Sequence, residues 1–184
     1  IFSLGLILIY LQWFGSRSIV FSDSQMCMHK IQKLYQLSID SAQEKDFFSQ
    51  KEYIISAIEL TEEAVNRTPL DSDLHFIKGK LLSLLEGYDD EAKSSFELEL
   101  KLDPYWVDLP LRQSEIWLYI DIKHTLTLWV EALKRAEKID QNYVRLIWKK
   151  ILDQAKRQPI QMRDVYNIIL DRDDPYYINL WMEF

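Results

Sequence analysis

Apolar side chains recur along most of the chain at intervals of three and four residues. From residue 24 onward the recurring positions are Ile31, Leu34, Tyr35, Ile54, Ile58, Thr61 and Val65. Such spacing places the side chains on one face of an α-helix. Helix breaks are predicted near Asp46, at Thr68-Pro69-Leu70, at Gly87, at Asp103-Pro104, at Pro110 and at Pro159. The pattern predicts an all-α fold in which successive helices pack antiparallel as hairpins.

The second half of the chain is rich in tryptophan. Helices are expected there near 111–122, 124–139, 141–156 and 161–170, and the tryptophans are Trp106, Trp117, Trp129, Trp148 and Trp181. One predicted helix face carries Trp129, Ala132, Leu133 and Ala136, with Lys134, Arg135 and Lys138 largely outside it. Tryptophans spaced 11 or 12 residues apart are typical of the packed interior of hairpins. The other interpretation is a glycan-binding groove.

Composition narrows the classes of function. The 184 residues include only 4 Gly and 5 Pro, which is too few for phosphate-binding loops, dinucleotide fingerprints or a β-sandwich. The net charge of −7 argues against a nucleic-acid partner. Cys27 is the single cysteine, so no intramolecular disulfide forms, and we expect it to pack as a small apolar residue between helices.

The first 14 residues carry no charge. Because a membrane span needs about 20 such residues, we predict that residues 1–16 are part of a transmembrane helix that begins upstream. Tyr10, Trp13 and Phe14 would then lie at the lipid headgroups. The alternative is a buried N-terminal core helix.

Candidate catalytic chemistry is sparse. His29, His75 and His124 lack metal-ligand spacing, and Asp171, Asp173 and Asp174 lack the frame of a calcium loop. We therefore predict no catalytic, cofactor-binding or metal site. Charge is unevenly distributed, since residues 134–157 hold eight basic and three acidic side chains whereas residues 40–63 hold two basic and seven acidic. These stretches are either solvated helix faces or, for the basic one, a surface directed at an anionic partner.

An internal repeat appears at a spacing of 35 residues. The matching pairs are Tyr53 and Tyr88, Ala57 and Ala92, Glu62 and Glu97, and Pro69 and Pro104. The second copy adds Gly79, Leu82 and Phe96. In order and spacing this pattern resembles the tetratricopeptide (TPR) repeat. The resemblance implies an α-solenoid in which Gly79 and Ala92 allow close helix approach, Phe96 fills the space between helices and Pro104 ends the second helix.

Two positions depart from the repeat pattern. Glu99 stands where the family has a small residue, and Thr61 stands where the first copy should have Phe. The turn at Gly87 also carries one extra residue.

A wider resemblance is to the C-terminal tail of bacterial O-antigen ligase or polymerase-like membrane proteins. It is carried by Leu109-Pro110-Leu111-Arg112, Trp117, Leu128-Trp129, Ala132-Leu133 and Arg135-Ala136. The resemblance implies three regions: a truncated span over 1–16, TPR-like hairpins over 24–104 and a Trp-rich helical continuation over 105–184. It implies an extracytoplasmic, non-catalytic domain on the periplasmic side of the inner membrane, in a protein that handles lipid-linked glycans.

The partner would be a protein or a glycan, bound on the concave face of the hairpins with contributions from Lys78, Leu82 and Arg112. The alternative to a glycan-enzyme tail is a stand-alone, membrane-anchored TPR adaptor. A third hypothesis is a soluble enzyme whose site is not recognisable from the sequence.

Overall fold

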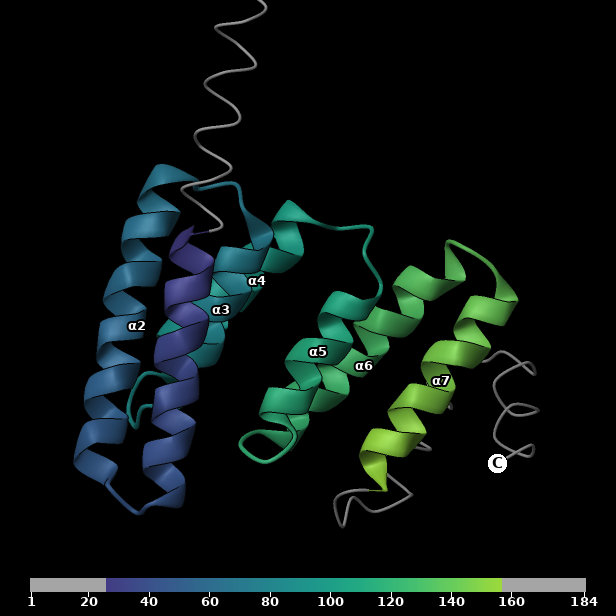
Figure 1. The fold of residues 1–184 in the computed structure, drawn as a ribbon. Helices are drawn as coiled ribbons and strands as arrows, with labels where there is room; N and C mark the ends of the chain where they lie inside the picture. Colours follow the sequence, from purple (N-terminus) through teal and green to yellow (C-terminus); the bar gives the residue numbers. More distant parts are fainter. Residues whose placement is uncertain (1–25, 157–184) are drawn as a thin grey trace, which may run out of the picture. The chain divides into compact units, whose positions relative to one another are not determined.

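The computed structural model describes residues 26–156, and all regular structure in that range is helical (Figure 1). The prediction of an all-α fold is confirmed. No helix within this range is long and apolar enough to cross a membrane. Residues 1–16, the helix expected near 161–170, Trp181 and the aspartates of 171–174 lie outside the described range.

The helices follow one another through short connections. They are a helix over 26–43, α2 (Phe47–Arg67), α3 (Ser72–Leu82), α4 (Asp89–Leu102), α5 (Asp108–Trp117), α6 (Ile122–Glu137) and α7 (Gln141–Ala155). The chain divides into two compact units, a first unit of Ile1–Ser95 and a second unit of Phe96–Phe184. Helix α4 therefore begins in the first unit and ends in the second.

Aspartates begin four of these helices. The carboxylates of Asp46, Asp71, Asp121 and Asp140 accept backbone N–H groups at the starts of α2, α3, α6 and α7. At α2, the Ser49 hydroxyl and backbone N–H hold the pKa of Asp46 below its ordinary value of 3.8. The breaks predicted near Asp46 and at Gly87, which has a positive φ of 87°, are confirmed.

The break predicted at Pro110 is wrong. Pro110 lies in the first turn of α5, which begins two residues earlier at Asp108. Backbone N–H groups of a first turn have no acceptor within the helix, so a proline there removes no hydrogen bond. Proline therefore marks the beginning of this helix rather than an interruption.

The core of the first unit lies between the helix over 26–43, α2 and α3. It contains Ile31, Ala57, Ala64, Leu74 and Leu81, and Cys27 packs against it as expected. The polar Thr61 is also buried, and its hydroxyl donates to the Ala57 carbonyl oxygen at 2.7 Å. This bond within α2 satisfies the hydroxyl and allows Thr61 to occupy the apolar face.

The core of the second unit is built around three tryptophans. Trp117 and Trp129 are fully buried, as predicted for tryptophans spaced 11 or 12 residues apart, and Trp148 is fully buried as well. Phe96 meets Trp117 edge to face, with ring centroids 6.1 Å apart. The prediction of a packed interior is wrong for Trp106, which is exposed in the connection between α4 and α5.

Arg135 contradicts the expected pattern of α6, because its side chain is buried and only 5% exposed. Its guanidinium donates to the carbonyl oxygens of Leu100 (3.3 Å), Asp103 (3.0 Å) and Trp106 (3.0 Å). The last carbonyl oxygens of a helix have no N–H donor within it and carry a partial negative charge. Arg135 therefore caps the end of α4 and fixes the following connection, a role that residue type alone does not reveal.

Candidate functional site

A groove of ≈ 260 Å³ is the principal candidate binding site in the first unit. Its lining comes from α2, α3, the connection that follows α3 and the first turn of α4. The lining residues are Ile55, Ile58, Glu59, Glu62, Lys78, Leu82, Leu85, Tyr88 and Glu91. The groove thus combines apolar side chains with three carboxylates and one ammonium group.

Helical periodicity explains how α2 forms one wall of this groove. The lining positions 55, 58, 59 and 62 lie at intervals that share one helix face. The buried positions 54, 57, 61 and 64 follow a parallel stripe, displaced by about one residue. One stripe of α2 therefore packs into the core while its neighbour remains available to a ligand.

The groove is acidic overall. Lys78 Nζ lies 2.8 Å from Glu62 Oε1, so these two charges offset each other. Glu59 and Glu91 have no cationic partner among residues 26–156. Two carboxylates beside an apolar floor favour a ligand that has both an apolar group and positive charge.

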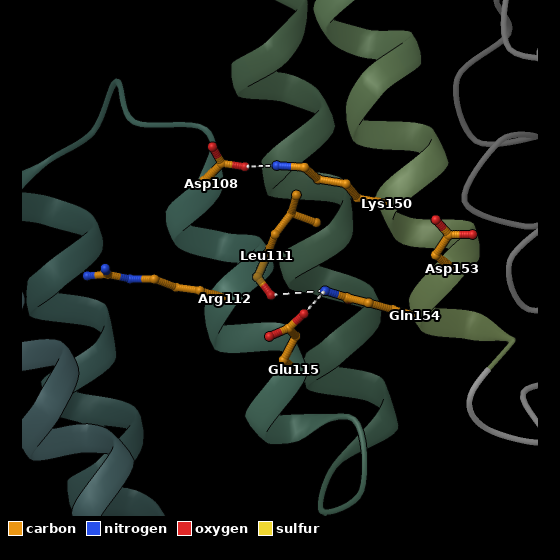
Figure 2. Close-up of a pocket in the computed structure, with 7 residues that line it drawn as sticks. All are labelled: Asp108, Leu111, Arg112, Glu115, Lys150, Asp153 and Gln154. Carbon is orange, nitrogen blue, oxygen red and sulfur yellow. Dashed lines mark hydrogen bonds and ion pairs between the residues drawn. The ribbon is translucent and has the colours of Figure 1, made fainter.

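A second hollow, of ≈ 390 Å³, lies between α5 and α7 in the second unit (Figure 2). Its lining residues are Asp108, Leu111, Arg112, Glu115, Lys150, Asp153 and Gln154. Lys150 extends along one edge to Asp108, with Nζ 2.6 Å from Oδ1. Arg112 points away from Lys150 and Gln154 and pairs with Glu99.

Gln154 forms the floor of this second hollow and is only 4% exposed. Its Oε1 accepts hydrogen bonds from Trp129 Nε1 at 2.6 Å and from Ser114 Oγ at 2.7 Å. Its Nε2 consequently faces the Leu111 carbonyl (3.3 Å) and Glu115 Oε1 (3.4 Å). Because these groups satisfy one another across α5, α6 and α7, the arrangement stabilises the bundle and leaves little to recognise a ligand.

The unusual Glu99 of the repeat pattern belongs to a second buried network. Its side chain is 0% exposed. Gln113 Nε2 donates to Glu99 Oε2 at 2.7 Å and to the Phe96 carbonyl at 3.0 Å, while Arg112 forms an ion pair with the other carboxylate oxygen. Paired and hydrogen-bonded on both oxygens, a carboxylate can occupy this interior position.

The repeat-defining residues fall into three groups. Ala57, Gly79, Leu82, Ala92 and Phe96 are buried, Tyr53 is half-buried, and Pro69, Tyr88 and Pro104 are exposed. Leu82 and Tyr88 line the groove of the first unit, as does Lys78. Arg112 lies instead in the second unit, directed at Glu99.

Sequence reasoning did not identify Ile55, Glu59, Leu85 or Glu91 as groove residues. The available signal was weak: Ile55 and Glu59 follow a stripe next to the buried stripe of α2, but nothing in the sequence indicates that this stripe borders a hollow. Leu85 and Glu91 belong to the turn and helix that follow α3, so their approach to α2 depends on tertiary packing.

Two of the histidines, His75 and His124, have structural roles. His75 Nε2 is hydrogen-bonded to the Pro69 carbonyl oxygen at 2.8 Å. The His124 ring packs edge-on against Trp117, with ring centroids 5.2 Å apart. No group of three metal-ligating side chains occurs within residues 26–156. Comparisons with protein-family models, curated proteins and solved structures gave no match to this chain.

Proposed function

We propose that this chain is a non-catalytic helical interaction domain whose groove binds an apolar, positively charged segment of a protein partner. The acidic groove of the first unit carries this proposal. Its apolar floor includes Ile55, Leu82 and Leu85, and its carboxylates Glu59 and Glu91 have no ion-pair partner in the described part of the chain. A helix or extended segment with a leucine-like anchor beside a lysine or arginine matches both properties.

We further propose that the helices form TPR-like hairpins. The 35-residue spacing of Tyr53 and Tyr88 supports this, as does the burial of Ala57 and Ala92 at equivalent positions. In repeat proteins of this kind the hairpins present an extended surface to partners. Binding in a groove between successive helices fits that architecture.

The setting we propose is the extracytoplasmic tail of a membrane protein resembling bacterial O-antigen ligases or polymerases. The uncharged residues 1–14 and the motif at Leu109-Pro110-Leu111-Arg112 support this setting. The apolar floor of the groove favours a protein partner over a glycan, since sugars present mainly hydroxyl groups. A stand-alone anchored adaptor would use the same groove.

Binding to a synthetic peptide tests the proposal. The probe is a fluorescein-labelled amphipathic helix of leucine and lysine, compared by anisotropy with a leucine–glutamate helix of the same length. We expect the full chain to bind the lysine peptide and not the glutamate peptide. The double variant Glu59→Gln, Glu91→Gln should weaken this binding by about tenfold or more, because it removes two unpaired carboxylates beside the groove.

Matched controls separate groove binding from general attraction. Ile55→Asp should abolish binding, because Ile55 lines the groove. Ile122→Asp in the second unit should leave binding intact, and it is a matched control because both isoleucines are 39% exposed. Glu44→Gln combined with Glu97→Gln removes the same number of charges outside the groove. Equal effects of the groove pair and this control pair would contradict the proposal.

A further inference from the structure

We infer that the groove of one chain receives the exposed face of α7 from a second copy of the same chain. This inference rests on the proposed function, because it identifies the occupant of that groove. It gives the uneven charge of the sequence a role, since acidic side chains predominate over 40–63 and basic ones over 134–157.

The exposed face of α7 has the chemistry that the groove requires. Lys149 lies four residues after Arg145 and three after Leu146, so its side chain neighbours both on the helix surface. Leu146 is 47% exposed, which is unusual on a helix whose other large aliphatic residues are buried. Lys149 forms no ion pair with any residue of 26–156.

Arg145 and Lys149 are also like charges at a spacing of four residues. Such pairs destabilise an isolated helix slightly. A surface that places an apolar side chain beside two cations is suited to a partner with carboxylates beside an apolar hollow.

The two surfaces complement each other group by group. Leu146 corresponds to the apolar floor formed by Ile55, Ile58 and Leu85, and the two cations correspond to Glu59 and Glu91. A hollow of ≈ 260 Å³ between helices is of a size that accepts an aliphatic side chain projecting from another helix. Exposed apolar and charged groups would thereby be covered together on both chains.

The association would join two different surfaces of the chain. The groove belongs to the first unit and α7 to the second, so the two contacting surfaces differ. Interfaces of this heterologous type generate rings when the rotation closes and filaments when it does not. Self-association should therefore give either a closed ring, of which a dimer with two reciprocal contacts is the smallest, or a filament, and it should weaken as salt concentration rises.

Mixing two charge-reversal variants of the full chain tests the inference. The groove variant is Glu59→Lys, Glu91→Lys, and the α7 variant is Arg145→Glu, Lys149→Glu. All four side chains are exposed, so both variants should keep the helical circular dichroism of the parent chain. The mass of the assemblies is measured by light scattering, with every sample in the same detergent micelles to accommodate the uncharged residues 1–14. These residues are identical in all samples, so any contribution they make to the measured mass is the same in each.

We expect the parent chain to self-associate in low salt and each variant alone to do so about tenfold or more weakly. An equimolar mixture of the two variants should regain association, because an acidic groove again meets a basic α7 and a basic groove meets an acidic α7. No regain in the mixture would overturn the inference, as would undiminished association of either variant alone.

The remaining outcomes separate the possible causes of failure. If the leucine–lysine peptide binds the groove but the mixed variants remain monomeric, the groove binds a different protein and only this inference fails. If the peptide does not bind either, the proposed function fails with it. If the α7 variant instead loses adsorption to vesicles containing phosphatidylglycerol while the groove variant keeps it, α7 faces an anionic membrane and the inference is wrong.

Discussion

Replacing Arg135 with methionine tests whether a buried cation holds the connection between α4 and α5. Methionine retains an unbranched apolar stem and removes the guanidinium. The three carbonyl oxygens of Leu100, Asp103 and Trp106 would then lose their donors. Glu131, which is partly exposed, would return to water at little cost.

The expected effect on stability follows from these contacts. A hydrogen bond from a charged donor contributes about 1.5–3 kcal/mol, and a carbonyl that can turn to water recovers part of this. For three carbonyls beside the end of a helix we expect a loss of about 3 kcal/mol in the free energy of unfolding. In a unit of this size, such a loss lowers Tm by at least about 12 °C.

Thermal unfolding followed by tryptophan fluorescence measures this loss, because three buried tryptophans belong to the second unit. Lys134→Met is the matched control, since Lys134 is the exposed neighbour of Arg135 on α6 and its replacement should change stability by less than about 0.5 kcal/mol. Arg135→Lys should fall between the two. Equal melting temperatures for the methionine variants at 134 and 135 would refute the capping role.

Three other substitutions probe separate features. Gln154→Leu removes the nearer of two acceptors of the Trp129 indole N–H and should lower the urea midpoint by the equivalent of about 1–2 kcal/mol, whereas an unchanged midpoint would contradict the buried network. Gly87→Ala should lower the free energy of unfolding by about 1 kcal/mol, because the φ of 87° is unfavourable for a residue with a Cβ. The cost is limited to the backbone, since an added Cβ meets nothing within 4 Å, and Gly87→Asn should cost less because asparagine tolerates positive φ. Asp46→Ala should destabilise the chain at neutral pH but not in acid. Folding lowers the pKa of Asp46, so its carboxylate stabilises α2 at pH values above the ordinary pKa of 3.8. This stabilisation is lost as the pH falls through the lower pKa of Asp46 in the folded chain. Melting curves on both sides of that pH measure the difference.

Helical periodicity and helix-breaking residues predicted most of the described helices. The stripe of Ile54 and Thr61 on α2 is buried as expected, and the connections at Asp46 and Gly87 lie where turn-forming residues indicated them. These features are local, because they depend on side-chain spacing within one helix and on the backbone preferences of single residues. Local patterns are what a sequence displays directly.

The features that sequence reasoning missed depend on partners far along the chain. Arg135 is buried because carbonyls 29 to 35 residues earlier accept its hydrogen bonds, and Glu99 is buried because Arg112 and Gln113 approach it. A charged residue on a helix indicates a solvated position unless its partners are known. Lys78 and Leu82 were predicted to contact a partner and do line the groove, but its other walls escaped prediction for the same reason, since they come from three helices.

The position of α4 has a practical consequence for dividing this protein into fragments. Ala92 is buried in the first unit and Phe96 in the second, although both belong to one uninterrupted helix. Cutting the chain at the boundary between Ser95 and Phe96 would leave each fragment with half of α4, too short to be stable as a helix by itself. Fragments intended to fold separately should therefore both contain Asp89–Leu102, one ending after it and the other beginning before it.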